Sequence, residues 1–121
     1  MALDEGVTGA GLDVNFESTG APLREFLHVD DVANAVYYIM QNHDDPEVIN
    51  IGYGSDITIK ALAEKIAAAA GLKGEIKWDA SKPDGMNRKL IDSSRARALG
   101  WNPQNTLEEG IKRTIKEYME E

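Results

Sequence analysis

The segment Asp79-Ala-Ser-Lys-Pro-Asp-Gly-Met-Asn-Arg-Lys-Leu90 carries the side chains that are best placed to do chemistry. The chain as a whole is acidic, with 21 Asp and Glu residues against 13 Lys and Arg residues and a net charge of −8. Five of the 13 cations nevertheless gather in and just after this segment, at Lys82, Arg88, Lys89, Arg95 and Arg97. Pro83-Asp84-Gly85 is typical of a tight turn, so we expect the segment to bind a small anion. A nucleic acid is not expected as a partner, because the negative net charge would repel it.

The composition predicts one globular domain. The chain has 121 residues, of which 42% are hydrophobic and 28% charged, and this is enough to bury a core. It has no cysteine, which excludes disulfides and thiolate chemistry and suits a reducing cytoplasm. No apolar run approaches the roughly 18 residues of a membrane span. The first residues lack the basic and apolar regions of a signal peptide. We therefore expect a cytoplasmic protein with no membrane partner.

Apolar spacing and turn residues predict a small α/β domain over residues 13–121, after an irregular, Gly-rich lead-in over residues 1–12. Short strands are expected at residues 13–16, 47–51 and 75–78, with extended segments at 23–29 and 89–92. About four helices are expected, beginning at Asp30 and Asp31, at Thr58, at Ser93 and at Thr106. The pattern indicates a short sheet with helices and not a complete Rossmann domain.

The residues at the helix ends support these boundaries. Asp30 and Asp31 are interpreted as N-terminal caps and not as catalytic acids. The first helix then has apolar residues on one face, at Val32, Val36, Ile39 and Met40. Gly71 is expected to end the second helix. Thr106 and Glu109 form a capping box before the last one.

Sequence signals for a cofactor or a metal are missing. The dinucleotide-binding pattern Gly-x-Gly-x-x-Gly does not occur between a predicted strand and helix. Gly6-Val-Thr-Gly9-Ala-Gly11 comes closest but has the wrong spacing and no preceding strand. Gly52-Tyr-Gly54 follows a predicted strand but lacks the third glycine, so it is interpreted as a plain turn, with a phosphate-binding turn as the alternative. His28 and His43 are the only histidines, and we expect them at the surface or in turns and not in a metal site. Trp78 and Trp101 are expected to pack against the fold. No catalytic, cofactor-binding or metal-binding residue is assigned.

Several motifs occur in one order along the chain. They are Gly20-Ala-Pro-Leu-Arg-Glu-Phe-Leu-His-Val-Asp-Asp31, Asn50-Ile-Gly-Tyr-Gly54, Asp79-Ala-Ser-Lys-Pro-Asp-Gly85, Arg88-Lys-Leu90 and Leu99-Gly-Trp101. Together they resemble the C-terminal part of GDP-L-fucose synthase, an extended short-chain dehydrogenase/reductase of the epimerase/dehydratase family. The resemblance covers roughly residues 13–121. It implies a nucleotide-sugar-binding domain, since in the full-length family a separate Rossmann domain binds NADP and supplies the catalytic Ser-Tyr-Lys set.

The resemblance implies three substrate-binding residues. Arg24 matches an arginine that contacts the nucleotide-sugar, Asp84 a substrate-binding aspartate, and Lys89 a lysine near the diphosphate. Arg can bind phosphate oxygens bidentately and Lys adds a compact charge. From the residues alone, Arg24 could instead pair with Glu25 or Asp30, Asp84 could bond the backbone of its own turn, and Lys89 could be solvated.

The chain departs from the family at one place. Glu17 and Ser18 stand where the family has Trp-Gly, and a Trp there would contact the substrate. A Glu near a diphosphate would repel it. Two functions are therefore carried forward. The first is a nucleotide-sugar-binding domain that is not active alone, and the alternative is a structural or interaction module that kept the fold and lost the ligand.

The resemblance also sets expectations for partners. The expected ligand is a GDP-sugar, and no cofactor is expected in this chain. Self-association is expected, because the apolar surface that faces the Rossmann half in the family must be covered in another way. A separate Rossmann-domain chain is the other protein partner considered.

Overall fold

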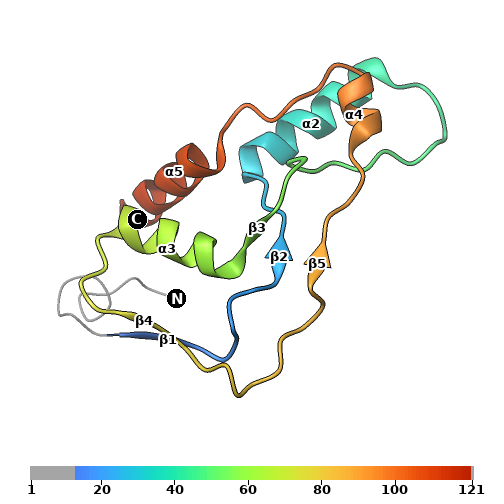
Figure 1. Ribbon diagram of the computed structural model, residues 1–121. Coiled ribbons are helices and arrows are strands. Elements are labelled where there is room, and N and C mark those ends of the chain that lie inside the picture. Colours follow the sequence, from blue (N-terminus) through green and yellow to red (C-terminus); the bar gives the residue numbers. More distant parts are fainter. Residues whose placement is uncertain (1–12, 121) are drawn as a thin grey trace.

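The computed structural model describes residues 13–120, so the expected lead-in over residues 1–12 lies outside the described part. The elements, in chain order, are β1 (Val14–Phe16), β2 (Leu23–Arg24), α2 (Val29–Asn42), β3 (Ile57–Thr58), α3 (Ile59–Ala70), β4 (Ile76–Trp78), β5 (Arg88–Lys89), α4 (Ser94–Ala98) and α5 (Leu107–Met119). Figure 1 shows short strands in the middle and lower part of the molecule and helices beside and above them. The predicted class, a small α/β domain with a short sheet and about four helices, is confirmed.

The strands form two short sheets. β1 and β4 pair in parallel, with Phe16 opposite Trp78, and the two rings stack with their centroids 4.8 Å apart. The second sheet has the order β3-β2-β5, in which β2 is antiparallel to β3 and parallel to β5. The strands predicted around residues 13–16 and 75–78 are therefore present, and Trp78 packs as expected.

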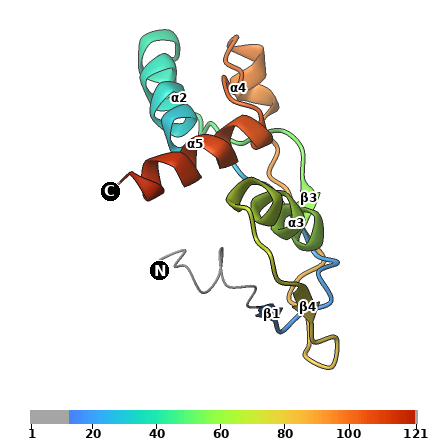
Figure 2. The same cartoon turned by 90° about the vertical axis from the view of Figure 1, so that its left-hand side faces the viewer.

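A small hydrophobic core joins α2 to α4. It consists of Ala35, Ala96 and Trp101, whose exposed fractions are 0%, 0% and 2%. The indole Nε1 of Trp101 donates to Asn34 Oδ1 at 3.0 Å, so the ring is fixed at its polar edge as well. Figure 2 shows α4 on one side of α2. Packing is thus the observed role of Trp101.

The helices α3 and α5 lie side by side, and their ends follow the predicted signals (Figure 1). Thr58 Oγ1 accepts the N–H of Ala61 at 3.1 Å, and α3 ends at Gly71 with φ of 75°. Thr106 and Glu109 form the complete capping box. These boundaries are confirmed. Among residues 13–120, no helix is long and apolar enough to cross a membrane.

The caps of α2 and α4 differ from the prediction. His28 is the N-cap of α2, because its Nδ1 accepts the N–H of Asp30 at 3.0 Å. Asp30 and Asp31 lie in the first turn instead, so their interpretation as N-caps is wrong. His28 is also not a surface residue, since its side chain is 5% exposed. At α4 the Ser93 side chain makes no capping hydrogen bond, and Asp92 Oδ1 accepts the first free N–H, at 2.9 Å.

No strand forms at residues 47–51, where one was predicted. The alternation of a strand is present, since Ile49 and Ile51 pack against the core whereas Val48 is 76% exposed. No strand of the described chain pairs with this segment, so its alternation does not produce a ladder. The strand β3 forms instead at Ile57–Thr58, next to β2.

Candidate functional site

Arg24 and Lys89 lie next to each other on the three-stranded sheet. Arg24 is on β2 and Lys89 on β5, and the parallel register pairs these two residues directly. Paired residues of neighbouring strands project from the same face, and the strands are about 4.8 Å apart. The structure therefore brings together two of the three predicted site residues, although they are far apart in the sequence.

Neither cation has an acidic partner within residues 13–120. The guanidinium of Arg24 donates to the backbone carbonyl of Leu23 at 2.8 Å, and Lys89 is exposed. The acids considered as partners of Arg24 are engaged elsewhere: Glu25 accepts a backbone N–H at 2.7 Å, and Asp30 pairs with another arginine. The alternative in which Arg24 braces the fold through either acid is wrong.

Three arginines near this sheet have contacts within the protein, although Arg97 Nη1 is buried without a hydrogen-bond partner among the described residues. Arg88 forms an ion pair with Asp56, with Nε 2.6 Å from Oδ2. Arg95 pairs with a glutamate of the segment after α2 at 3.0 Å. Arg97 donates to the carbonyl oxygens of residues 52 and 53 at 3.0 and 2.8 Å. These contacts are structural, and they distinguish the three arginines from the pair on β2 and β5.

Asp84 anchors the basic loop to the turn that precedes β2. Its Oδ1 accepts from Ser18 Oγ at 2.7 Å and from the N–H of Thr19 at 3.0 Å, and its Oδ2 accepts from Thr19 Oγ1 at 2.6 Å. The Thr19 hydroxyl, followed by the Ser18 hydroxyl and the Thr19 amide, stabilises the ionised carboxylate and lowers the pKa of Asp84. Asp84 thus bonds a different turn and not the backbone of its own. Its role in substrate binding stays a prediction.

The anchored loop reaches Arg24. A Cβ placed on Gly85 would lie 3.7 Å from Arg24 Nη2, so the guanidinium lies against the Pro-Asp-Gly turn. The site is therefore an exposed sheet face with two cations and a loop held beside it by Asp84. Two positive charges on neighbouring strands repel each other, and a bound anion would relieve this repulsion.

Sequence reasoning missed Ser18 and Thr19 as functional residues. Ser18 Oγ also accepts the N–H of Gly20 at 3.0 Å, so one hydroxyl both shapes its turn and holds Asp84. Hydroxyl residues before a glycine are typical of turns. That signal predicts the turn but not its contact with a loop at the other end of the chain. Glu17, the other departure from the family, is exposed.

The turn Gly52-Tyr-Gly54 is occupied by a carboxylate. The N–H of Gly54 donates to Glu25 Oε2 at 2.7 Å. A Cβ placed on Gly52 would lie 2.6 Å from the same oxygen, which explains why a glycine is needed there. A phosphate at this turn would meet a negative charge, so the structure favours the plain turn over the phosphate-binding alternative.

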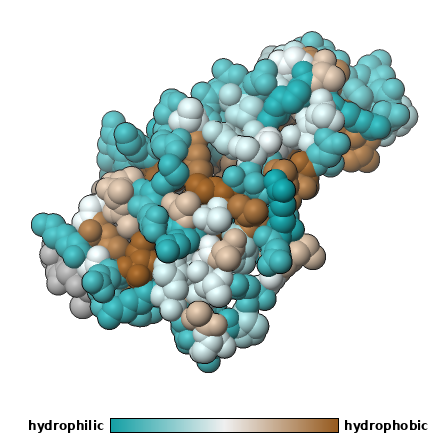
Figure 3. Space-filling model, in the orientation of Figure 1, coloured by the Kyte–Doolittle hydropathy of each residue, from teal (hydrophilic) through white to brown (hydrophobic). Residues whose placement is uncertain are grey.

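A hydrophobic groove lies between α3 and α5, and Figure 3 shows brown surface in this region. Its volume is about 340 Å³, and its apolar lining includes Phe26, Leu62, Ile66, Leu107, Ile111 and Ile115. None of the three predicted site residues lines it. The predicted anion site is therefore an open face and not part of this cavity.

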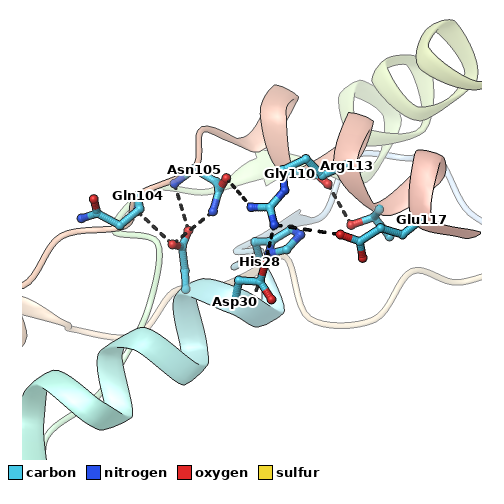
Figure 4. Close-up of polar contacts among 9 residues, drawn as sticks. His28, Asp30, Gln104, Asn105, Gly110, Arg113 and Glu117 are labelled. Carbon is cyan, nitrogen blue, oxygen red and sulfur yellow. Dashed lines mark hydrogen bonds and ion pairs between the residues drawn. The ribbon is translucent and has the colours of Figure 1, made fainter.

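A polar network fastens the start of α2 to α5 (Figure 4). The Arg113 guanidinium contacts Asp30 and donates to Asn105 Oδ1 at 2.9 Å. Asp31 is 1% exposed, and its carboxylate accepts the backbone N–H groups of Gln104 at 3.0 Å and Asn105 at 3.1 Å. Both acids therefore have structural contacts that join α2 to the segment before α5 and to α5 itself.

Comparison with known proteins finds relatives that are named GDP-L-fucose synthase. The model of the NAD dependent epimerase/dehydratase family matches residues 4–52. The chain is 51% identical over 102 residues to probable GDP-L-fucose synthase 1 of Oryza sativa subsp. japonica, which covers 84% of this chain and 31% of the rice protein. It is 43% identical over 117 residues to GDP-L-fucose synthase of Escherichia coli (strain K12), covering 89% of this chain and 36% of that protein. The chain thus spans about a third of the length of these relatives.

Comparison of the fold with solved structures also finds a GDP-L-fucose synthetase. The structure is similar to a GDP-L-fucose synthetase from Naegleria fowleri, with a TM-score of 0.86 and 27% sequence identity. The match covers 92% of this chain and 35% of the other. The chain is therefore a relative of the GDP-L-fucose synthases, to which it corresponds over about a third of their length within the fold of the extended epimerases and reductases.

Proposed function

We propose that the sheet face with Arg24 and Lys89 binds the diphosphate of a GDP-sugar. The observation that carries the proposal is the direct pairing of these cations in the β2–β5 register, with no acid in residues 13–120 to neutralise either one. A diphosphate has several anionic oxygens, which a guanidinium can bind bidentately while an ammonium adds a point charge. The relatives named GDP-L-fucose synthase support the choice of a GDP-sugar.

Asp84 contributes to the proposed site in two ways. Its hydrogen bonds to Ser18 and Thr19 hold the loop next to Arg24. A carboxylate has about four lone-pair sites, and three are used here, so one acceptor position remains on Oδ2 for a sugar hydroxyl. Glu17 precedes this anchor and is exposed, and a carboxylate near a diphosphate would repel it.

The expected affinity is low. Hydrogen bonds to charged groups contribute about 1.5–3 kcal/mol each, so two phosphate contacts give about 3–6 kcal/mol. This corresponds to dissociation constants between about 6 mM and about 40 μM. The proposal concerns recognition and assigns no step of hydride transfer to these residues. A nicotinamide-binding Rossmann domain, in the same polypeptide or in a separate chain, would supply that chemistry.

Calorimetric titration of the chain with GDP-fucose and with GDP tests the proposal. We expect saturable binding of both ligands in the high micromolar to millimolar range. Arg24→Ala and Lys89→Ala should each weaken binding about tenfold or more, because a loss of 1.4 kcal/mol is about a factor of ten. Circular dichroism of each variant checks that the fold is kept.

Lys73→Ala is the matched control, since it removes one positive charge from an exposed residue of the α3–β4 connection. This variant should bind both ligands as the unchanged chain does. Absence of heat at millimolar ligand, or an equal loss of binding in all three variants, would refute a specific site at Arg24 and Lys89. The first result would leave the alternative of an interaction module that has lost its ligand.

A further inference from the structure

The groove between α3 and α5 is a second candidate binding site, separate from the sheet face with Arg24 and Lys89. Its volume of about 340 Å³ is typical of a site for a small molecule. Its walls are mostly apolar, and none of the described residues that line it is Asp, Glu, Lys or Arg. An uncharged, largely apolar molecule suits such a groove, because a charged one would lose its hydration without gaining a partner.

His28 brings a buried hydrogen-bond donor to the wall of this groove. Its Nδ1 accepts the N–H of Asp30 at 3.0 Å, so Nδ1 carries no proton and the ring proton lies on Nε2. The side chain is 5% exposed, and Nε2 has no hydrogen-bond partner among residues 13–120. A buried donor without an acceptor destabilises the fold, so an acceptor atom supplied from the groove would stabilise it.

The orientation of the His28 ring directs Nε2 away from α2 and toward α5. Nδ1 faces the backbone at the start of α2, and the opposite edge of the ring faces α5. A Cβ placed on Gly110, which also lines the groove, would lie 3.4 Å from Cδ2, the ring atom bonded to Nε2. Figure 4 shows His28 between the two helices. The proton on Nε2 is therefore on the groove side of the ring.

Tyr53 brings a second donor to the same groove. Its hydroxyl oxygen accepts the N–H of Leu107 at 3.2 Å, which leaves the hydroxyl proton available for another acceptor. Two neutral donors in an apolar groove are suited to a neutral oxygen acceptor. A carboxylate is less suitable, because no cation among the described lining residues would compensate its charge.

We propose that the α3–α5 groove binds a small, uncharged, apolar molecule whose carbonyl oxygen accepts the Nε2–H of His28. The apolar walls bury the body of the molecule, and the carbonyl gives the buried donor its missing partner. The apolar face of another helix would fill the groove less well. The backbone carbonyl groups of a helix are bonded within the helix, so His28 Nε2 would stay unpaired.

Acetophenone and α-methylstyrene are a matched pair of probes, because they have nearly the same shape and differ in that a C=CH2 group replaces the carbonyl. Each is titrated into the full chain and followed by NMR of the backbone amides and of the His28 ring. We expect both probes to shift the amide signals of residues that line the groove, at millimolar concentration. Only acetophenone should move the Nε2–H signal of His28 downfield, as a new hydrogen bond does. No shift in the groove with either probe, or the same ring-proton shift with both, would refute the proposal.

His28→Asn tests the donor itself. Asn is a preferred N-cap residue, so this variant keeps a cap on α2 and removes the imidazole donor. The ratio of the acetophenone affinity to the α-methylstyrene affinity should fall about fivefold or more, and the ratio cancels changes in groove shape that affect both probes. An unchanged ratio would contradict the hydrogen bond. If the variant does not fold, the ring-proton signal of the unchanged chain still decides the question.

Filling the groove tests its location. Ile66 lines the groove and is 37% exposed, so a larger side chain there takes up part of the space. Ile66→Trp should weaken both probes about tenfold or more. Val48→Trp is the matched control, because Val48 is 76% exposed and does not line the groove, and it should bind both probes as the unchanged chain does. Full affinity in Ile66→Trp would place the probes elsewhere and overturn the proposal. None of these variants alters Arg24 or Lys89, so the result is independent of GDP-sugar binding.

Discussion

At the scale of single residues, the partners of a charged group decide what it can do. Arg88 and Arg24 occupy neighbouring positions of one small sheet, yet Arg88 is neutralised by Asp56, and Arg24 has only a backbone carbonyl. Asp84 is the reverse case, because three hydrogen bonds already occupy most of the acceptor positions of its carboxylate. The cations without partners are therefore the better candidates for binding an anion, and Asp84 is first an anchor for the loop beside them.

The anchor role of Asp84 predicts a pH dependence. Its folded pKa is lowered, chiefly by the hydroxyl of Thr19, so the anchor is fully present above the unfolded value of about 3.9 and is lost as the pH falls through the folded pKa. A carbon-13 NMR titration of the Asp84 carboxyl group should give a pKa below that of a free aspartate. Thr19→Val should raise it. A pKa at the free value in the unchanged chain would contradict the anchor seen here.

At the scale of elements, local signals predicted helices well and strands less well. The ends of α3 and α5 follow from Thr58, Gly71 and the capping box, all of which act within one turn. The strand predicted at 47–51 has the right alternation but no pairing partner among the described strands, and pairing is a non-local property. His28 was missed as a cap because histidine is not one of the preferred N-cap residues.

The same limit applies to the candidate site. Arg24, Asp84 and Lys89 were named from motifs, but motifs do not show which residues meet. The pairing of Arg24 with Lys89 depends on the register of two strands separated by α2 and α3, and the anchoring of Asp84 by Ser18 joins residues 66 positions apart. Neither contact leaves a pattern within a short sequence window, so only the folded chain reveals them.

Two glycines at the borders of elements test how tightly α3 packs on β4. Gly20 and Gly71 have similar φ of 79° and 75°. A Cβ on Gly20 would lie 2.8 Å from Lys60 Cβ and 3.0 Å from the Trp78 ring, whereas nothing lies within 4 Å at Gly71. Gly71→Ala should cost only the backbone term of about 1–2 kcal/mol. Gly20→Ala should cost about 1–3 kcal/mol more from overpacking.

Urea denaturation of both variants measures this difference in the free energy of unfolding. The shared positive φ makes Gly71→Ala the control for Gly20→Ala, so the excess reports packing alone. Equal losses in the two variants would mean that the contacts among residue 20, α3 and β4 are not as close as described.

At the scale of the whole molecule, the elements fall into two groups, and a few polar contacts hold the two groups together. The α2–α4 end has the Trp101 core, and the other end has α3, α5 and the β1–β4 pair (Figures 1 and 2). Among the described residues, the fully buried hydrophobic side chains are only Ala35, Ala96 and Trp101. Asp31 is buried where α2 meets the segment before α5, and its carboxylate fixes that segment.

Loss of Asp31 should therefore destabilise the whole chain. Asp31→Ala leaves the N–H groups of Gln104 and Asn105 without their acceptor, and each unsatisfied donor costs about 1–3 kcal/mol, so we expect a loss of about 2–6 kcal/mol. The neighbouring Asp30→Ala is the control, because its ion pair with Arg113 is exposed and such pairs contribute about 0–1 kcal/mol. Chemical denaturation at neutral pH compares the two. Comparable losses would show that Asp31 does not hold α2 and α5 together, since the buried carboxylate would then contribute no more than an exposed one.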